Sequence, residues 1–90
     1  MTPSGKLELA PAAAHQLGRV RGPALVALRG VILALATDRR PVGARTLAGR
    51  TDLWRTRLRI DGSPWRVIYQ VRDVERLVVV TRVARRDEGT

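Results

Sequence analysis

Three arginines at alternate positions are the side chains in this sequence that are best suited to chemistry. The alternation places Arg55, Arg57 and Arg59 on one face of a predicted strand. The opposite face is largely apolar and is formed by Trp54, Thr56, Leu58 and Ile60. Like charges at such positions repel one another, and the fold does not need them there. The row is therefore either a solvated outer face or a face that binds phosphate groups.

A second alternating segment lies close to the first. It runs from Trp65 to Arg72, after the turn signal Asp61-Gly62-Ser63-Pro64, and brings Arg66 to the same hairpin. Clustered guanidiniums can hold a phosphate and stabilise the charge of a pentacovalent phosphorane. RNA carries its own nucleophile, the 2′-hydroxyl, so positioning and charge stabilisation can suffice for cleavage. A face that only binds nucleic acid would have the same residues.

Other kinds of active site find little support in the sequence. The two predicted strands contain no Asp, Glu or His, so neither a carboxylate pair nor a Ser-His-Asp set accompanies the arginines. The chain has no Cys, its single His is His15, and it has no Gly-rich phosphate loop before a helix. We expect no metal and no cofactor. The lack of Cys, of a signal peptide and of a membrane-spanning run predicts a cytoplasmic protein without a membrane partner.

The charge balance points to an anionic partner. The chain of 90 residues has a net charge of +9 and contains sixteen Arg but one Lys. Arg fits bidentate phosphate recognition, and it also fits codon bias in a GC-rich genome. Codon bias does not explain the clustering in the second half of the chain. A polyanion or an acidic protein is the predicted partner.

The remaining sequence predicts one α+β domain over residues 1–90, with frayed ends at 1–5 and 87–90. A short strand at 6–9 precedes helices at 11–20 and 23–37, which form a helical hairpin. A loop extends to about residue 51, and a third strand at 77–83 follows the arginine-bearing hairpin. The predicted order is β-α-α-β-β-β, with the helical hairpin on one face of a mainly antiparallel four-stranded sheet. Trp54, Leu58, Val67 and Tyr69 should lie beneath the helices.

Three stretches resemble the signature of the RelE/ParE toxin superfamily. They are residues 53–58 (LWRTRL), 65–71 (WRVIYQV) and 83–87 (VARRD). The resemblance implies the fold described above. It also implies a toxin of a type II toxin–antitoxin system that is neutralised by an acidic antitoxin in a hetero-oligomer. RelE-like members are mRNA interferases, which enter the ribosomal A site and cleave mRNA by metal-independent attack of the 2′-hydroxyl.

Carried over residue by residue, the resemblance implies a catalytic set of Arg55, Arg57, Arg66 and Arg86, with Arg85 in place of Arg86 after a one-residue shift. We expect further RNA-binding side chains at Arg45, Arg50, Arg59, Arg82 and Arg85. A solubilising role in the loop fits Arg45 and Arg50 equally well.

The sequence departs from the family pattern in two places. Arg85 stands where His is common, and no Tyr lies near the C-terminus. Tyr69 should point into the core, and Trp65 either packs against the core or stacks on a base. Two alternatives therefore stay open: a ParE-like inhibitor of DNA gyrase, and a catalytically degenerate member that only binds its antitoxin or RNA.

Overall fold

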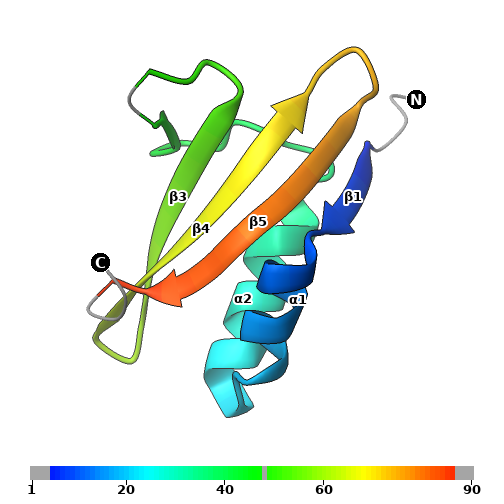
Figure 1. Ribbon diagram of the computed structural model, residues 1–90. Coiled ribbons are helices and arrows are strands. Elements are labelled where there is room, and N and C mark those ends of the chain that lie inside the picture. The colour runs from blue at the N-terminus through cyan, green and yellow to red at the C-terminus, as the bar shows by residue number, and fades with distance from the viewer. Residues whose placement is uncertain (1–4, 48, 87–90) are drawn as a thin grey trace.

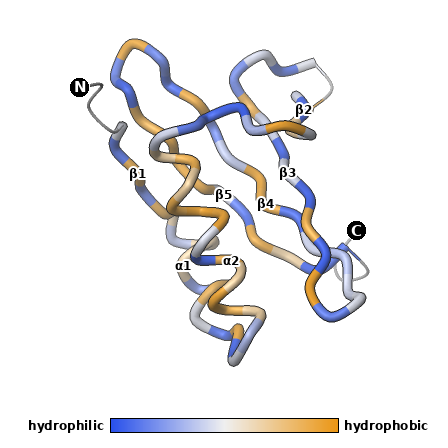
Figure 2. The backbone as a smooth tube through the Cα atoms, turned by 180° about the vertical axis from the view of Figure 1, so that it is seen from behind, coloured by the Kyte–Doolittle hydropathy of each residue, from blue (hydrophilic) through white to orange (hydrophobic). Residues whose placement is uncertain are grey.

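The computed structural model describes residues 5–47 and 49–86, and the predicted frayed segments lie almost wholly outside this part of the chain. Its elements are β1 (Lys6–Leu9), α1 (Pro11–Gly18), α2 (Gly22–Ala34), β2 (Arg45–Thr46), β3 (Leu53–Ile60), β4 (Ser63–Arg72) and β5 (Leu77–Arg85). The strands form one sheet in the order β1-β5-β4-β3-β2. Both helices cover the same face of this sheet (Figures 1 and 2).

The predicted α+β class and order of elements are confirmed, and the sheet has one strand more than predicted. β1 pairs with β5 in parallel, whereas β3, β4 and β5 form the predicted antiparallel meander. The additional strand is β2, in the segment predicted as a loop, where Arg45 lies opposite Arg55 and Thr46 opposite Trp54. Among the described helices, none is long and apolar enough to cross a membrane.

The helical hairpin is determined by the Pro and Gly residues that delimit its helices and by the apolar stripe of α2. Pro11 suits the first helical position of α1 because its φ is already fixed. Gly22, the first residue of α2, has a φ of 64°, which an L-residue with a side chain rarely adopts. α2 then places Leu28, Ile32 and Leu35 on its buried side, as the spacing predicts. α1 ends two residues earlier than predicted and α2 three residues earlier.

The β3–β4 hairpin closes with a two-residue turn at Asp61 and Gly62. Their φ angles are 50° and 83°, the left-handed values of a type I′ turn, which matches the twist of the flanking strands. The turn fixes the register, so that Ile60 pairs with Ser63 and the pairing continues back along both strands. The predicted alternation of β3 is confirmed: Thr56 and Ile60 are buried on the helix side, and Arg57 is exposed on the other.

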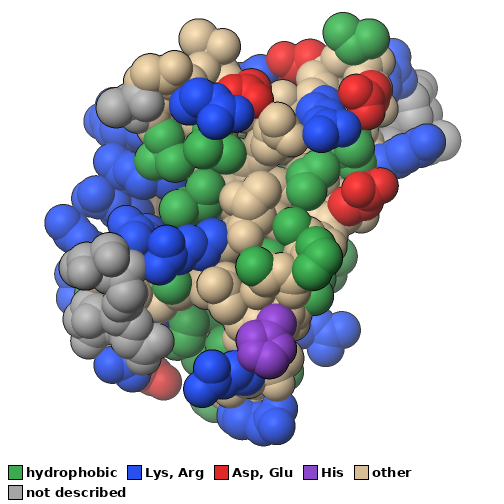
Figure 3. Space-filling model, viewed as in Figure 1, with side chains coloured by type: hydrophobic (Ala, Val, Ile, Leu, Met, Phe, Trp, Pro, Cys, Tyr) green, Lys and Arg blue, Asp and Glu red, His purple; other side chains and the backbone are tan. Residues whose placement is uncertain are grey.

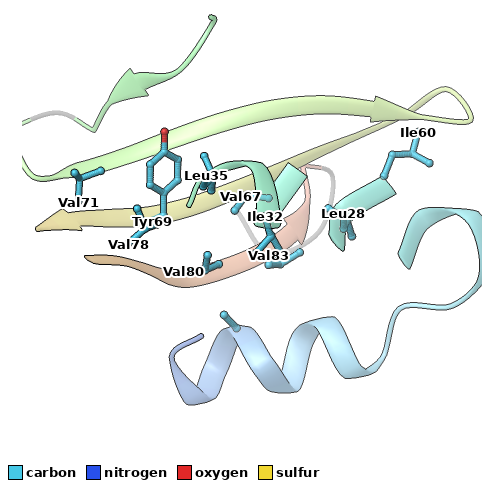
Figure 4. Packing of buried hydrophobic residues seen from close by; sticks show 11 residues of the cluster. Leu28, Ile32, Leu35, Ile60, Val67, Tyr69, Val71, Val78, Val80 and Val83 are labelled. Atoms are coloured by element: carbon cyan, nitrogen blue, oxygen red, sulfur yellow. The ribbon is translucent and has the colours of Figure 1, made fainter. Parts of the chain in front are cut away.

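The core lies between α2 and the covered face of the sheet. Figure 4 shows the stripe of α2 pointing toward Val67 and Tyr69 of β4 and Val80 and Val83 of β5. Tyr69 is fully buried, and its hydroxyl donates a 2.8 Å hydrogen bond to the carbonyl of Arg39. Burial raises the pKa of Tyr69 to about 12. Trp54 and Leu58 are only partly buried and pack at the margin of the core.

A β-bulge in β5 decides which side chains reach the open face. Ile68 pairs with Arg82 and Tyr69 with Val80, so Thr81 is an extra residue in β5. Strict alternation from Val80 would have turned Arg82 toward the core. The bulge instead buries Val83 and places Arg82 opposite Ile68 on the uncovered face.

Candidate RNA-binding site

Five arginines gather on the face of the sheet that the helices leave open, and we refer to them as the Arg cluster. Its members are Arg45, Arg55, Arg57, Arg66 and Arg86. Arg57 lies directly opposite Arg66 across β3 and β4, and Arg45 lies opposite Arg55 across β2 and β3. Lys and Arg side chains gather on the same side of the space-filling view as β3 (Figure 3).

The end of β5 brings Arg86 to the other members of the Arg cluster. The backbone N–H of Arg86 donates a 2.8 Å hydrogen bond to the carbonyl of Pro64, which ties this residue to the start of β4. Arg86 and Arg57 then line a common hollow of about 300 Å³ at the hairpin end of the sheet. This hairpin-end hollow is also lined by Leu58, Arg59, Pro64 and Trp65.

Mutual repulsion dominates the electrostatics of the Arg cluster. The pKa of Arg57 is lowered, first by the charge of Arg55, then by desolvation, and then by the charges of Arg86, Arg66 and Arg45. No salt bridge to a carboxylate neutralises any of the five within residues 5–47 and 49–86. The Nε of Arg66 is buried and has no hydrogen-bond partner in that part of the chain. The Arg cluster therefore carries positive charge that no described carboxylate compensates.

Three carboxylates among the described residues, Asp52, Asp73 and Glu75, form ion pairs with arginines outside the Arg cluster. Arg50 binds Asp52 through two hydrogen bonds of 3.1 and 3.2 Å. These bonds and one from Gln70 lower the pKa of Asp52 to about 2. Arg50 was predicted to contact RNA, but the structure places it in this ion pair, outside the Arg cluster.

A second group of ion pairs forms around the β4–β5 turn. Arg39 and Arg40 share Asp73, with N–O distances of 3.3 and 2.8 Å. The guanidinium of Arg40 also lies 5.3 Å from the ring centroid of Trp54. These contacts hold the segment after α2 against the sheet, and Asp73 partly neutralises the charges of Arg39 and Arg40.

The other three predicted RNA contacts lie in three different environments. Arg59 lines the hairpin-end hollow and donates a 3.1 Å hydrogen bond to the carbonyl of Gly62. Arg82 lies opposite Ile68 in the sheet and also lines the hollow between β5 and the turn of the helical hairpin. Arg85 lies opposite Trp65 and so belongs to the side that the helices cover. The spacing Val78, Val80, Val83 was the sequence signal for the bulge that produces this division.

The chemistry available to the Arg cluster is electrostatic. Guanidiniums that converge from three strands and the end of a fourth can bind a phosphate through bidentate hydrogen bonds. Tyr69 cannot serve as a proton donor there, because it lies in the core and its hydroxyl binds Arg39. Among the described residues, no three His, Cys, Asp or Glu side chains are placed to hold a metal ion.

Comparison with known structures identifies the fold. No protein-family model matches the sequence, and no curated protein matches it. Isolated RelE from E. coli superposes with a TM-score of 0.78 at 19% identity, over 96% of this chain and 88% of that one. RelBE2 from Mycobacterium tuberculosis gives a TM-score of 0.72 at 22% identity, over 93% and 100%. The RelE–RelB complex from Pyrococcus horikoshii gives 0.73 at 18% identity, over 97% and 100%.

The chain therefore has the fold of the RelE toxins, a helical hairpin packed on one face of a mixed sheet. This confirms, at the level of the fold, the resemblance seen in the sequence. Two of these structures, from Mycobacterium tuberculosis and Pyrococcus horikoshii, are of toxin–antitoxin complexes.

Proposed function

We propose that this protein is the toxin of a toxin–antitoxin pair and that it cleaves mRNA. The observation that carries the proposal is the Arg cluster, five cations without a counter-charge among the described residues, on the open sheet face of a RelE fold. Charge of this density costs stability, and a phosphate group compensates it. The structurally similar proteins are toxins, which supports the same role here.

The proposed reaction is an internal transesterification of RNA. The 2′-hydroxyl oxygen attacks the adjacent phosphorus, and the bond from phosphorus to the 5′-oxygen breaks. The 2′-hydroxyl proton is released, the leaving oxygen takes up a proton, and the products are a 2′,3′-cyclic phosphate and a 5′-hydroxyl. Arg55 and Arg57 approach the phosphate from β3, and Arg66 and Arg86 from the other side, so that the phosphorane is held between them.

Substrate positioning is the second contribution that the reaction requires. A 2′-hydroxyl in line with the leaving oxygen reacts much faster than one that samples other orientations. We propose that the ribosomal A site holds mRNA in this orientation in the cytoplasm. Arg45, Arg59 and Arg82 then bind neighbouring phosphates. Arg85 and Arg50 remain predicted RNA contacts, the latter only if RNA displaces Asp52.

An acidic antitoxin is the proposed protein partner. The net charge of +9 and the unneutralised Arg cluster favour a segment rich in Asp and Glu that folds on this surface. Exposed charges are screened beyond a Debye length of roughly 8–10 Å, so we expect the affinity of the complex to fall with salt. An affinity that is equal at low and high salt, measured by calorimetry, would instead indicate a mainly apolar interface.

Primer extension on cellular transcripts after induction tests the proposed reaction. New 5′ ends inside open reading frames, which appear before growth stops, are the expected result. Intact transcripts together with gyrase-linked DNA breaks would show a ParE-like toxin instead. The described part of the Arg cluster offers no His, Tyr or carboxylate for proton transfer, which is the observation that favours this second function. Growth arrest with neither signature, or no arrest, would indicate a degenerate member.

A further inference from the structure

We propose that a second basic hollow, on the helix side of the sheet, is a subsite for a nucleotide that flanks the cleaved phosphate, with its base stacked on Trp65. The proposal rests on the RNA-binding function given above. The hollow has a volume of about 530 Å³ and lies between the turn of the helical hairpin and the ends of β4 and β5. We refer to it as the helix-side hollow. Gln16, Arg19, Arg21 and Trp65 are among the residues that line it.

Trp65 joins the helix-side hollow to the Arg cluster. Trp65 is the residue that lines both this hollow and the hairpin-end hollow, which is also lined by Arg57 and Arg86. A strand of RNA whose phosphate lies in the Arg cluster therefore reaches Trp65 as it passes over the end of the β3–β4 hairpin. Stacking on an aromatic ring suits any base, because every base has a π-face.

The charge around the helix-side hollow favours a polyanion. Arg19 and Arg21 line it from the turn of the helical hairpin, and no described residue that lines either hollow is acidic. Residues 11–37 contain no Asp or Glu at all. Arg21 donates one N–H to the carbonyl of Gly18, at 3.1 Å, and its other N–H groups can bind a ligand. Both cations can therefore track a sugar–phosphate backbone.

Gln16 gives the helix-side hollow a fixed polar group. Its Oε1 accepts a 2.7 Å hydrogen bond from the backbone N–H of Val83, which ties α1 to β5. This bond orients the side-chain amide, and its Nε2 has no partner among the described residues. Such an amide donates to the edge of a base or to a phosphate oxygen. A stacking ring, two cations and a fixed donor together suit a nucleotide better than an acidic peptide.

The test uses Trp65 as its own reporter. In a Trp54→Phe background Trp65 is the sole tryptophan and can be excited selectively over Tyr69. The ligand is a 2′-O-methyl RNA of about eight nucleotides, which lacks the nucleophile and cannot be cleaved. An abasic oligonucleotide of the same length carries the same phosphates without bases. We expect the RNA to quench Trp65 and to bind about ten-fold more tightly than the abasic strand. Trp65→Leu should abolish that difference, with thermal melting as the folding control.

Variants that remove single arginines test where the RNA strand runs over the protein. Arg19→Ala and Arg21→Ala should each lower the salt dependence of RNA binding by about 0.7 in the log–log slope, the value for one single-strand phosphate contact. Arg29→Ala is the matched control, since it removes an exposed arginine from α2 that lines neither hollow. Equal effects of all three variants would overturn the proposed path.

Two further outcomes also contradict the proposal. The first is an abasic strand that binds the wild-type protein as tightly as the RNA, a comparison that needs no variant. The second is a polyglutamate peptide that quenches Trp65 as strongly as the RNA, which would make the helix-side hollow a site for an acidic protein. If the helix-side hollow does not bind the base, primer extension should still show cleaved transcripts. If the protein does not cleave mRNA, primer extension shows intact transcripts, whatever the result of the fluorescence titration.

Discussion

Replacement of Arg66 by Ala should reduce the rate of mRNA cleavage about 10²–10³-fold, which corresponds to about 3–4 kcal/mol of transition-state stabilisation. The structure gives three reasons for the size of this effect. Arg66 lies directly opposite Arg57, so both guanidiniums can reach one phosphate. Its Nε is buried and has no hydrogen-bond partner among the described residues. A desolvated donor gains more from an anionic oxygen than a hydrated one does.

A matched control lies on the same strand and the same face. Arg72 is exposed, pairs with Glu75 at 3.6 Å, and donates a 3.1 Å hydrogen bond to Gln70. It has the same formal charge as Arg66 but lies at the other end of β4. Arg72→Ala should therefore leave the cleavage rate near that of the wild type.

The assay is cleavage of a defined transcript in a reconstituted translation reaction, with growth arrest on induction as the cellular readout. Arg66→Ala should keep the melting temperature of the wild type or exceed it, because the substitution removes a repulsive partner of Arg57. Equal losses in Arg66→Ala and Arg72→Ala would show that total charge, not position, matters. An unchanged rate in Arg66→Ala would refute the assignment of this site.

Arg57→Gln should raise the melting temperature at low salt and raise it less at high salt, because the lowered pKa of Arg57 reflects repulsion from the neighbouring arginines. Arg57→Lys should cleave RNA at a rate between those of the wild type and Arg57→Ala, because Lys keeps the positive charge but cannot form the bidentate hydrogen bonds of a guanidinium. The free energy of unfolding, measured in urea, should fall by about 2–3 kcal/mol as pH rises from about 10 to 12, because Tyr69 ionises at lower pH in the unfolded chain than in the fold. Tyr69→Phe should remove this pH dependence. At neutral pH the same substitution should cost about 1–2 kcal/mol, because it leaves the carbonyl of Arg39 without its hydrogen bond. Trp54→Ala should cost about 3 kcal/mol, the low end for a large aromatic, because its ring is partly buried beneath Arg40; a melting temperature equal to that of the wild type would contradict its place in the core.

The arginine-bearing hairpin could be predicted because two local signals agree in it. A period of two separates buried Thr56 and Ile60 from exposed Arg57, and the Asp-Gly turn fixes the register that brings Arg57 opposite Arg66. Both signals depend only on neighbouring residues. Nothing from the rest of the fold needs to be known in order to place these side chains.

The features that sequence reasoning missed depend on contacts between distant segments. β2 has two residues, too few for any periodicity, and it exists only because β3 offers a free edge beside it. The bulge at Thr81 is set by the need to bury Val83 after Val80. Asp52, which pairs with nearby Arg50, also accepts a hydrogen bond from Gln70 of β4, a residue distant in sequence. The functional roles of the Arg cluster remain a prediction.

The distribution of opposite charges argues that the repulsion in the Arg cluster serves binding. A surface that needed only solubility would intersperse the two signs, at no cost in repulsion. Among the described carboxylates, Asp52, Asp73 and Glu75 pair with arginines outside the Arg cluster, and Asp61, at the β3–β4 turn, forms no salt bridge with any described residue. Like charges directly opposite one another destabilise a sheet, and local conflicts of this kind tend to mark functional sites. The positive potential of the open face is therefore maintained against the stability of the fold, and an anionic ligand is what would relieve it.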